Sequence, residues 1–182
     1  MWWYGMAMRF LPNSRLFRLT QWEKTVAMVF LSALLLGSFI PGRIIVAISD
    51  SLDHRLFFLT PINRDKIKNG DYVVFQGNKE EMENHAKHML NKDLKRMIKK
   101  VGCVPGEMLT RDTQRQFFCQ GIFIGQALEA DSLNHPLPQF QSTGVVPEKN
   151  FFMIGTNPRS YDSKYFGFVG ADKILHKALP LW

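Results

Sequence analysis

Two serines, Ser49 and Ser51, lie close together in the segment AISDSLDHRLFF (residues 47–58), and His54 follows Ser51 by three positions. A serine hydroxyl becomes a nucleophile when a positioned base removes its proton. His54 is the nearest candidate base in the sequence. Catalytic pairs are assembled by folding, however, and neighbours along a strand rarely face each other. We therefore expect His54 to be a surface histidine and the base to lie elsewhere in the chain.

A basic cluster offers a different base: it consists of Lys92, Lys95, Arg96, Lys99 and Lys100. Strand alternation places Lys99 in an apolar row with Met97, Val101 and Cys103. Burial disfavours a charged ammonium and lowers its pKa, whose ordinary value is near 10.4. A drop of about two units would let an amine act as a base at neutral pH, whereas arginine could not. A serine–lysine pair is therefore the sharpest hypothesis, with Lys95 on the same face but four residues away.

Other polar patterns predict no further chemistry. His85 and His88 follow two glutamates, but neither an H-E-x-x-H pattern nor a paired C-x-x-C is present, so we expect a solvated helical face. The basic cluster lacks the interleaved aromatics of a nucleic-acid groove. We expect no metal, no cofactor and no nucleic acid. Cys103 and Cys119 lie in predicted strands, and both a disulfide and two buried thiols are compatible with them.

The charge pattern predicts how the chain is anchored. The formal net charge is +7, and basic residues precede the uncharged stretch TVAMVFLSALLLGSFIP. Such a stretch is long enough for a membrane span, although its length also suits a buried core helix. A cleaved signal peptide is disfavoured, because the preceding segment is long and no A-x-A-like cleavage site follows. The positive-inside bias puts the N-terminus in the cytoplasm. We expect an interfacial segment 1–24, a transmembrane anchor 25–41 and a periplasmic β-rich catalytic domain 42–182.

The remaining chain reads as many short strands with turn residues between them, which is typical of a mainly β, mostly antiparallel domain. We expect a helix or ordered excursion at 78–93 and a loop at 131–148. The predicted strands are 43–49, 56–59, 70–77, 94–104, a hairpin at 116–126, 150–156 and 165–174.

Four stretches in this order, SDSL, GDYVVF, KKVGCVPGE and GTNPRSYDSKYFG, resemble the type I signal peptidase family. Its members follow a membrane anchor with a signal-peptidase β domain and use a serine nucleophile with a lysine base. The resemblance implies that Ser51 is the nucleophile and that Lys99, six residues before Pro105, is the base. Ser49 then falls where some members place a hydroxyl that helps to stabilise the oxyanion.

The last motif carries the supporting residues. The resemblance implies that Ser160 hydrogen-bonds the base, while Asp162 and Lys164 pair to hold their loop. The chain departs from the family pattern at four places. Asp53-His54-Arg55 replaces a proline after the nucleophile, Cys103 replaces a glycine, and Glu107 replaces an aspartate. Lys164 replaces an arginine, which weakens bidentate pairing.

The short chain is most similar to the conjugative-transfer TraF-type branch. That resemblance implies a membrane-anchored endopeptidase that matures exported preproteins or pilins, with inner-membrane lipid and pilus assembly proteins as further partners, and with pilin cyclisation as one outcome. Two alternatives stay open. One is a general type I signal peptidase. The other is a catalytically silent envelope component of a secretion apparatus.

Overall fold

The computed structural model describes residues 20–38, 42–77 and 96–182. The chain divides into two compact units, Met1–Pro41 and Gly42–Trp182, and each is described separately. The predicted helix at 78–93, with His85 and His88, lies outside the described residues, as do Lys92 and Lys95 of the basic cluster.

The first unit contains one described helix, α1 (Gln21–Ser38). Its start is a capping box: the Thr20 hydroxyl accepts a hydrogen bond from the Glu23 amide, and the Glu23 carboxylate accepts one from the Thr20 amide at 2.6 Å. Large apolar side chains along α1 are exposed, including Val29, Phe30 and Leu34. Among the helices described here, none combines the length and apolar character needed to span a membrane, and the predicted anchor 25–41 ends in residues outside the description.

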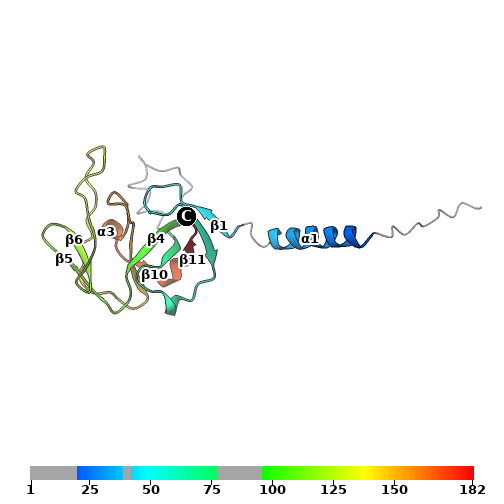
Figure 1. Cartoon of the computed structure of the whole chain (residues 1–182). Helices are drawn as coiled ribbons and strands as arrows, with labels where there is room; N and C mark the ends of the chain where they lie inside the picture. Colours follow the sequence, from blue (N-terminus) through cyan, green and yellow to red (C-terminus); the bar gives the residue numbers. More distant parts are fainter. Residues whose placement is uncertain (1–19, 39–41, 78–95) are drawn as a thin grey trace, which may run out of the picture. The chain divides into compact units, whose positions relative to one another are not determined.

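The second unit is built from two antiparallel sheets, which confirms the expected mainly β fold (Figure 1). Within the described residues the first sheet has seven strands, in the order β1 (Ile44–Val46), β2 (Leu56–Thr60), β11 (Ile174–Pro180), β3 (Tyr72–Gln76), β4 (Arg96–Cys103), β9 (Asn150–Ile154) and β10 (Val169–Gly170). The second sheet has the order β7 (Ile122–Gln126), β6 (Gln116–Cys119), β5 (Met108–Arg111) and β8 (Gly144–Val145). Short helical turns complete the unit: η1 (Arg64–Lys66), α3 (Ser163–Phe166) and η2 (Ala171–Lys173).

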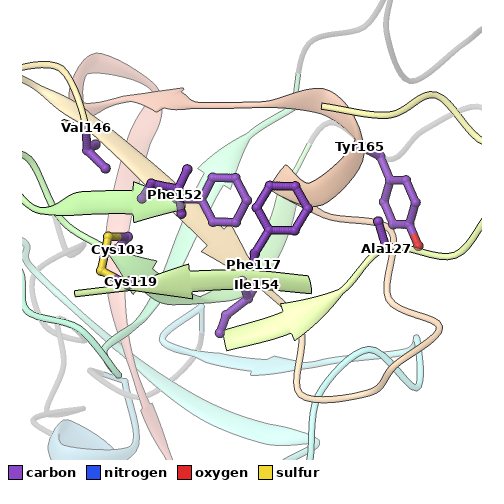
Figure 2. Packing of buried hydrophobic residues seen from close by; sticks show 9 residues of the cluster. Cys103, Phe117, Cys119, Ala127, Val146, Phe152, Ile154 and Tyr165 are labelled. Atoms are coloured by element: carbon purple, nitrogen blue, oxygen red, sulfur yellow. A yellow bond between two sulfur atoms is a disulfide. The ribbon is translucent and has the colours of Figure 1, made fainter. Parts of the chain in front are cut away.

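Aromatic residues fill the core that contains residues from both sheets. Phe117 of β6 and Phe152 of β9 are fully buried, with ring centroids 5.2 Å apart (Figure 2). Cys103 of β4 and Cys119 of β6 form a disulfide at the edge of this cluster, so the question that the sequence leaves open is answered in favour of the bridge. The bridge joins the strand that carries Lys99 to the second sheet.

Two expectations about strands need correction. The predicted strand 165–174 is wrong: this stretch holds the end of α3, then β10 and η2, and the long strand β11 begins only at its last residue, Ile174. The reason is local, because the Asp162 carboxylate accepts a hydrogen bond from the Lys164 amide and starts a helical turn. Strands β5 and β8 were not predicted; both are short, and their residues alternate too briefly to give a strand pattern.

Candidate active site

Lys99 is a buried lysine on β4. Its side chain is 4% exposed, and two of the three apolar neighbours predicted for its face, Met97 and Val101, belong to one core cluster. The third, Cys103, belongs to a different cluster, because the register with β9 shifts between Val101 and Cys103. Its Nζ donates a hydrogen bond of 2.7 Å to the Ser160 hydroxyl. Burial lowers the pKa of Lys99 to about 8; the Asp162 charge opposes the shift and the Lys164 charge adds to it. About a tenth of this amine is therefore neutral at pH 7, whereas a lysine with its ordinary pKa near 10.4 would be neutral in less than about a thousandth of the molecules.

The loop after β9 supplies the partner of Lys99. Ser160 is 2% exposed, and its backbone amide is held by the Asn157 carbonyl at 2.9 Å. Two residues later Asp162 is fully buried and forms an ion pair of 2.6 Å with Lys164. The Asp162 carboxylate also accepts the amide of Gly155 at 2.8 Å, so this one side chain closes the loop at both ends. A buried carboxylate needs such partners, because an unpaired buried charge is costly.

Ser49 and Ser51 lie in the turn between β1 and β2. The Ser49 hydroxyl donates a hydrogen bond of 3.2 Å to the Ser51 hydroxyl. Ser49 is exposed and Ser51 is partly buried, so a substrate can reach both hydroxyls. Of the hydrogen bonds formed by the described residues, none joins Ser51 to Lys99. Catalytic hydrogen bonds in unliganded enzymes are often long and shorten when substrate binds.

Gly155 brings the Ser51 turn and the Lys99 network together. A Cβ atom at Gly155 would overlap the Ser160 side chain and lie 2.6 Å from the Ser51 carbonyl oxygen. That carbonyl also accepts a hydrogen bond of 3.2 Å from the Asn157 amide. The nucleophile turn and the hydroxyl that binds Lys99 thus meet across a residue that must lack a side chain. Gly155 and Asn157 both belong to the quoted motif GTNPRSYDSKYFG, but sequence reasoning gave neither a role.

His54 takes no part in this network. Its ring packs edge-on against Phe57 and Tyr72, with centroids 6.3 and 5.8 Å away. In the turn after Ser51, Asp53 stands near the position of the proline expected from the family pattern. The Tyr72 hydroxyl donates a 2.7 Å hydrogen bond to the Asp53 carboxylate, and this bond ties the turn to β3. Burial, followed by the Asp53 carboxylate, raises the pKa of Tyr72, so the hydroxyl stays protonated and remains a donor.

One further cluster has the composition of a metal site. Ligand atoms of Cys103, Cys119 and Glu107 lie within 4.8 Å of one another. Both sulfur atoms are joined in the disulfide, and the Glu107 carboxylate accepts a 2.6 Å hydrogen bond from the Asn69 amide. Thiolates are the species that bind metal, so the bridged pair supplies no thiolate ligand.

A comparison with protein families finds one that covers most of the chain. The family model described as signal peptidase, peptidase S26, matches residues 19–182. A crystal structure of a signal peptidase I from Enterococcus faecalis is similar over 62% of this chain and 96% of its own, with 24% identity and a TM-score of 0.38. No curated protein sequence matches the chain.

Proposed function

The chain belongs to the signal peptidase family of peptidase S26, a family of serine peptidases, and from this premise we propose that it is an endopeptidase with Ser51 as nucleophile and Lys99 as general base. The observation that carries the proposal is the state of Lys99. This amine is buried, and its pKa is lowered to about 8. It donates a hydrogen bond to Ser160, whose side chain and the Ser51 carbonyl oxygen both lie against Gly155.

The reaction begins with proton transfer. Neutral Lys99 accepts the Ser51 hydroxyl proton while the serine oxygen attacks the scissile carbonyl carbon. Collapse of the tetrahedral intermediate breaks the C–N bond, and the Lys99 ammonium returns its proton to the leaving amine. The acyl-enzyme is then attacked by water, whose proton passes to Lys99. As the second tetrahedral intermediate collapses, the Lys99 ammonium returns this proton to the Ser51 oxygen, and the carboxylic acid is released. An amine in place of this water would form a new peptide bond instead.

The developing oxyanion needs donors. The Ser51 amide and the Ser49 hydroxyl are the two groups that we assign to this role. Ser49 is suited to it because its hydroxyl lies 3.2 Å from the Ser51 hydroxyl and is exposed to the substrate side. Removing one such donor typically costs about 3 kcal/mol of transition-state stabilisation.

The substrate residues before the cut site would lie extended beside β4. Strand β4 pairs with β3 along Arg96–Lys100, whereas β9 covers it only from Lys100 onward. Within the described part of the chain, backbone groups of residues 96–99 on that side have no strand partner. An extended peptide lying between this edge and the strand leading to Ser51 would add a strand to the sheet. The family resemblance implies that small residues precede the cut site.

We propose that residues 25–41 anchor the protein in the inner membrane, with 1–24 cytoplasmic and 42–182 periplasmic. Three observations support this topology. Residues 25–41 carry no charge, basic residues precede them, and large apolar side chains of α1 are exposed. The disulfide is also typical of an oxidising compartment.

The substrate that we favour is a pilin or another exported protein of a conjugation system. The support is the resemblance to the TraF-type branch, because no large β insertion separates the four quoted motifs in the sequence. Pilin cyclisation would need only an amine as the second nucleophile, and pilus assembly proteins would then be partners. A general signal peptidase is the alternative within the same chemistry.

Substitutions test the chemistry. We expect Ser51→Ala and Lys99→Ala to abolish cleavage of exported precursors while the protein stays folded. Lys99→Arg should also fail, because guanidinium does not release its proton at neutral pH. His54→Ala is the matched control and should cleave nearly normally. Loss of activity in His54→Ala with retained activity in Lys99→Ala would disprove the dyad.

Topology is tested separately. A reporter that is active only in the periplasm, fused after Trp182, should be active. Protease added to spheroplasts should digest the segment after Pro41. Protection of that whole segment would contradict the proposed orientation. Mass spectrometry of pilins from cells with and without the protein would show whether they are its substrates and whether their ends are joined.

A further inference from the structure

A groove of about 650 Å³ begins beside the Ser51 turn and runs along β7. Its floor is the segment 154–158, and this segment includes Asn157, whose amide donates to the Ser51 carbonyl. One wall is formed by β7, and the segment 100–102 of β4 lies on the other side. The volume lies within the range of about 300–1,000 Å³ that is usual for ligand sites. The groove therefore adjoins the active site through Gly155 and Asn157, the two lining residues that approach the Ser51 carbonyl.

The groove is lined mainly by apolar side chains. Ile122 and Phe123 are 71% and 54% exposed, and Ile124, Leu128 and Ile154 lie with them along the groove. Lys164 also lines it, but its charge is paired with Asp162. Large apolar side chains that gather on an exposed groove mark a binding surface. An apolar peptide side chain is the ligand that this lining favours.

The backbone of β7 offers a second means of binding. This strand lies at the end of its sheet and pairs with β6 in the part of the chain that the structure describes. An unpaired strand edge can accept an extended peptide through main-chain hydrogen bonds. The chain bends here, because the register with β6 shifts between Phe117 and Phe118 and Gly125 has a φ of 152°. A bulge of this kind bends the strand and changes the direction in which its unpaired edge faces.

Position along β4 determines which part of a substrate reaches the groove. In the proposed function the residues before the cut site lie beside 96–98. The groove lies beside 100–102, on the opposite side of Lys99. At about 3.3 Å per residue, the segment 100–102 lies about 3 to 10 Å beyond Lys99. This span corresponds to the first residues after the cut site.

We propose that the groove binds the first residues of the leaving peptide in extended form and selects apolar or aromatic side chains there. The inference rests on the proposed function, which places the residues before the cut site beside residues 96–98 of β4. It adds a determinant of substrate choice that lies on β7, away from the nucleophile and the base.

Peptide cleavage by the full-length protein in detergent micelles tests the selection. The peptides are identical before the cut site and carry Phe or Ser at the second position after it. We expect kcat/KM about 10-fold higher for the Phe peptide, which is the scale on which apolar pockets discriminate. In Ile122→Ser and Phe123→Ser the preference should fall to less than about 3-fold. Equal rates for both peptides in the wild type, or an unchanged preference in both variants, would overturn the inference.

Val145→Ser is the matched control. Val145 lies on β8, at the other end of the same sheet, and is 59% exposed. Substitutions at such exposed positions usually change stability by no more than about 0.5 kcal/mol, so all three variants should fold. The control should keep the full preference for Phe. Loss of the preference in Val145→Ser as well would show a general effect on the sheet and would also overturn the inference.

A binding measurement separates the inference from the proposed function. A fluorescent peptide that begins at the cut site, with Phe at its second position, is titrated onto Ser51→Ala protein and followed by anisotropy. Adding Phe123→Ser should weaken binding at least 5-fold, and adding Val145→Ser should not. If no peptide is cleaved but this dependence is seen, the proposed function fails and the groove stands. If cleavage depends on Ser51 but the affinity for the peptide is unchanged by Phe123→Ser, the inference alone fails.

Discussion

The pH dependence of cleavage gives the sharpest test of Lys99 as the base. The base acts in its neutral form, and burial lowers the pKa of Lys99 to about 8 in the folded protein. Because the shift is downward, activity should be gained as the pH rises through that value. From pH 6 to pH 9 the neutral fraction grows from about 1% to about 90%, so kcat/KM should rise about 90-fold and then level off.

The alternatives predict different curves. A histidine base with a pKa near 6.5 would give a rise of about 4-fold over the same range. A lysine with its ordinary pKa near 10.4 would give a rise approaching 1,000-fold with no plateau by pH 9. The assay is cleavage of a fluorogenic peptide at substrate concentrations below KM, with Ser51→Ala as the blank. A plateau reached by pH 7.5, or a curve abolished in His54→Ala, would refute the assignment of Lys99.

Three sets of substitutions test the remaining features. Ser49→Ala should lower kcat about 100-fold without abolishing it, because the Ser51 amide remains as an oxyanion donor. Single-turnover kinetics measures this loss, and a rate equal to that of the wild type would contradict the role of Ser49. Gly155→Ala should inactivate the enzyme, because the added Cβ atom would overlap atoms of Ser160. The control Gly37→Ala should leave activity unchanged, because no atom lies within 4 Å of its added Cβ. Equal activity of the two variants would contradict the close approach at Gly155. Replacing Cys103 and Cys119 by alanine should lower the free energy of unfolding by about 3 kcal/mol, as expected for opening a loop of about 15 residues. Urea unfolding measures this change, and an unchanged midpoint would contradict a stabilising disulfide.

The sequence alone predicted most strands of the first sheet. Segments 56–59, 70–77 and 94–104 appear as β2, β3 and β4, because short runs of apolar, β-branched and aromatic residues bounded by turn residues are a local property of the sequence. The hairpin at 116–126 appears as β6 and β7, with Gln120 and Gly121 in the turn at positive φ. The order of four motifs was enough to indicate the family, because such motifs are read directly along the chain.

Local patterns gave a wrong strand at one segment and left one question open. The stretch 165–174 contains aromatic and β-branched residues that favour a strand, yet α3 (Ser163–Phe166) extends into it, because the buried Asp162 side chain caps this helical turn. The disulfide could not be decided either, because the distance between Cys103 and Cys119 depends on how the two sheets pack.

For the candidate site, the sequence determined which residue types were available, and only the tertiary structure decided their environment. Strand alternation placed Lys99 in an apolar row, but its lowered pKa depends on residues of β9 and the following loop that cover it. The contact of Ser51 with the Gly155 segment joins positions about a hundred residues apart, and no local pattern encodes a close backbone approach. Burial, and therefore the electrostatics of a charged group, is a property of the packed chain, which is why the lysine could be nominated from sequence but its chemistry could not.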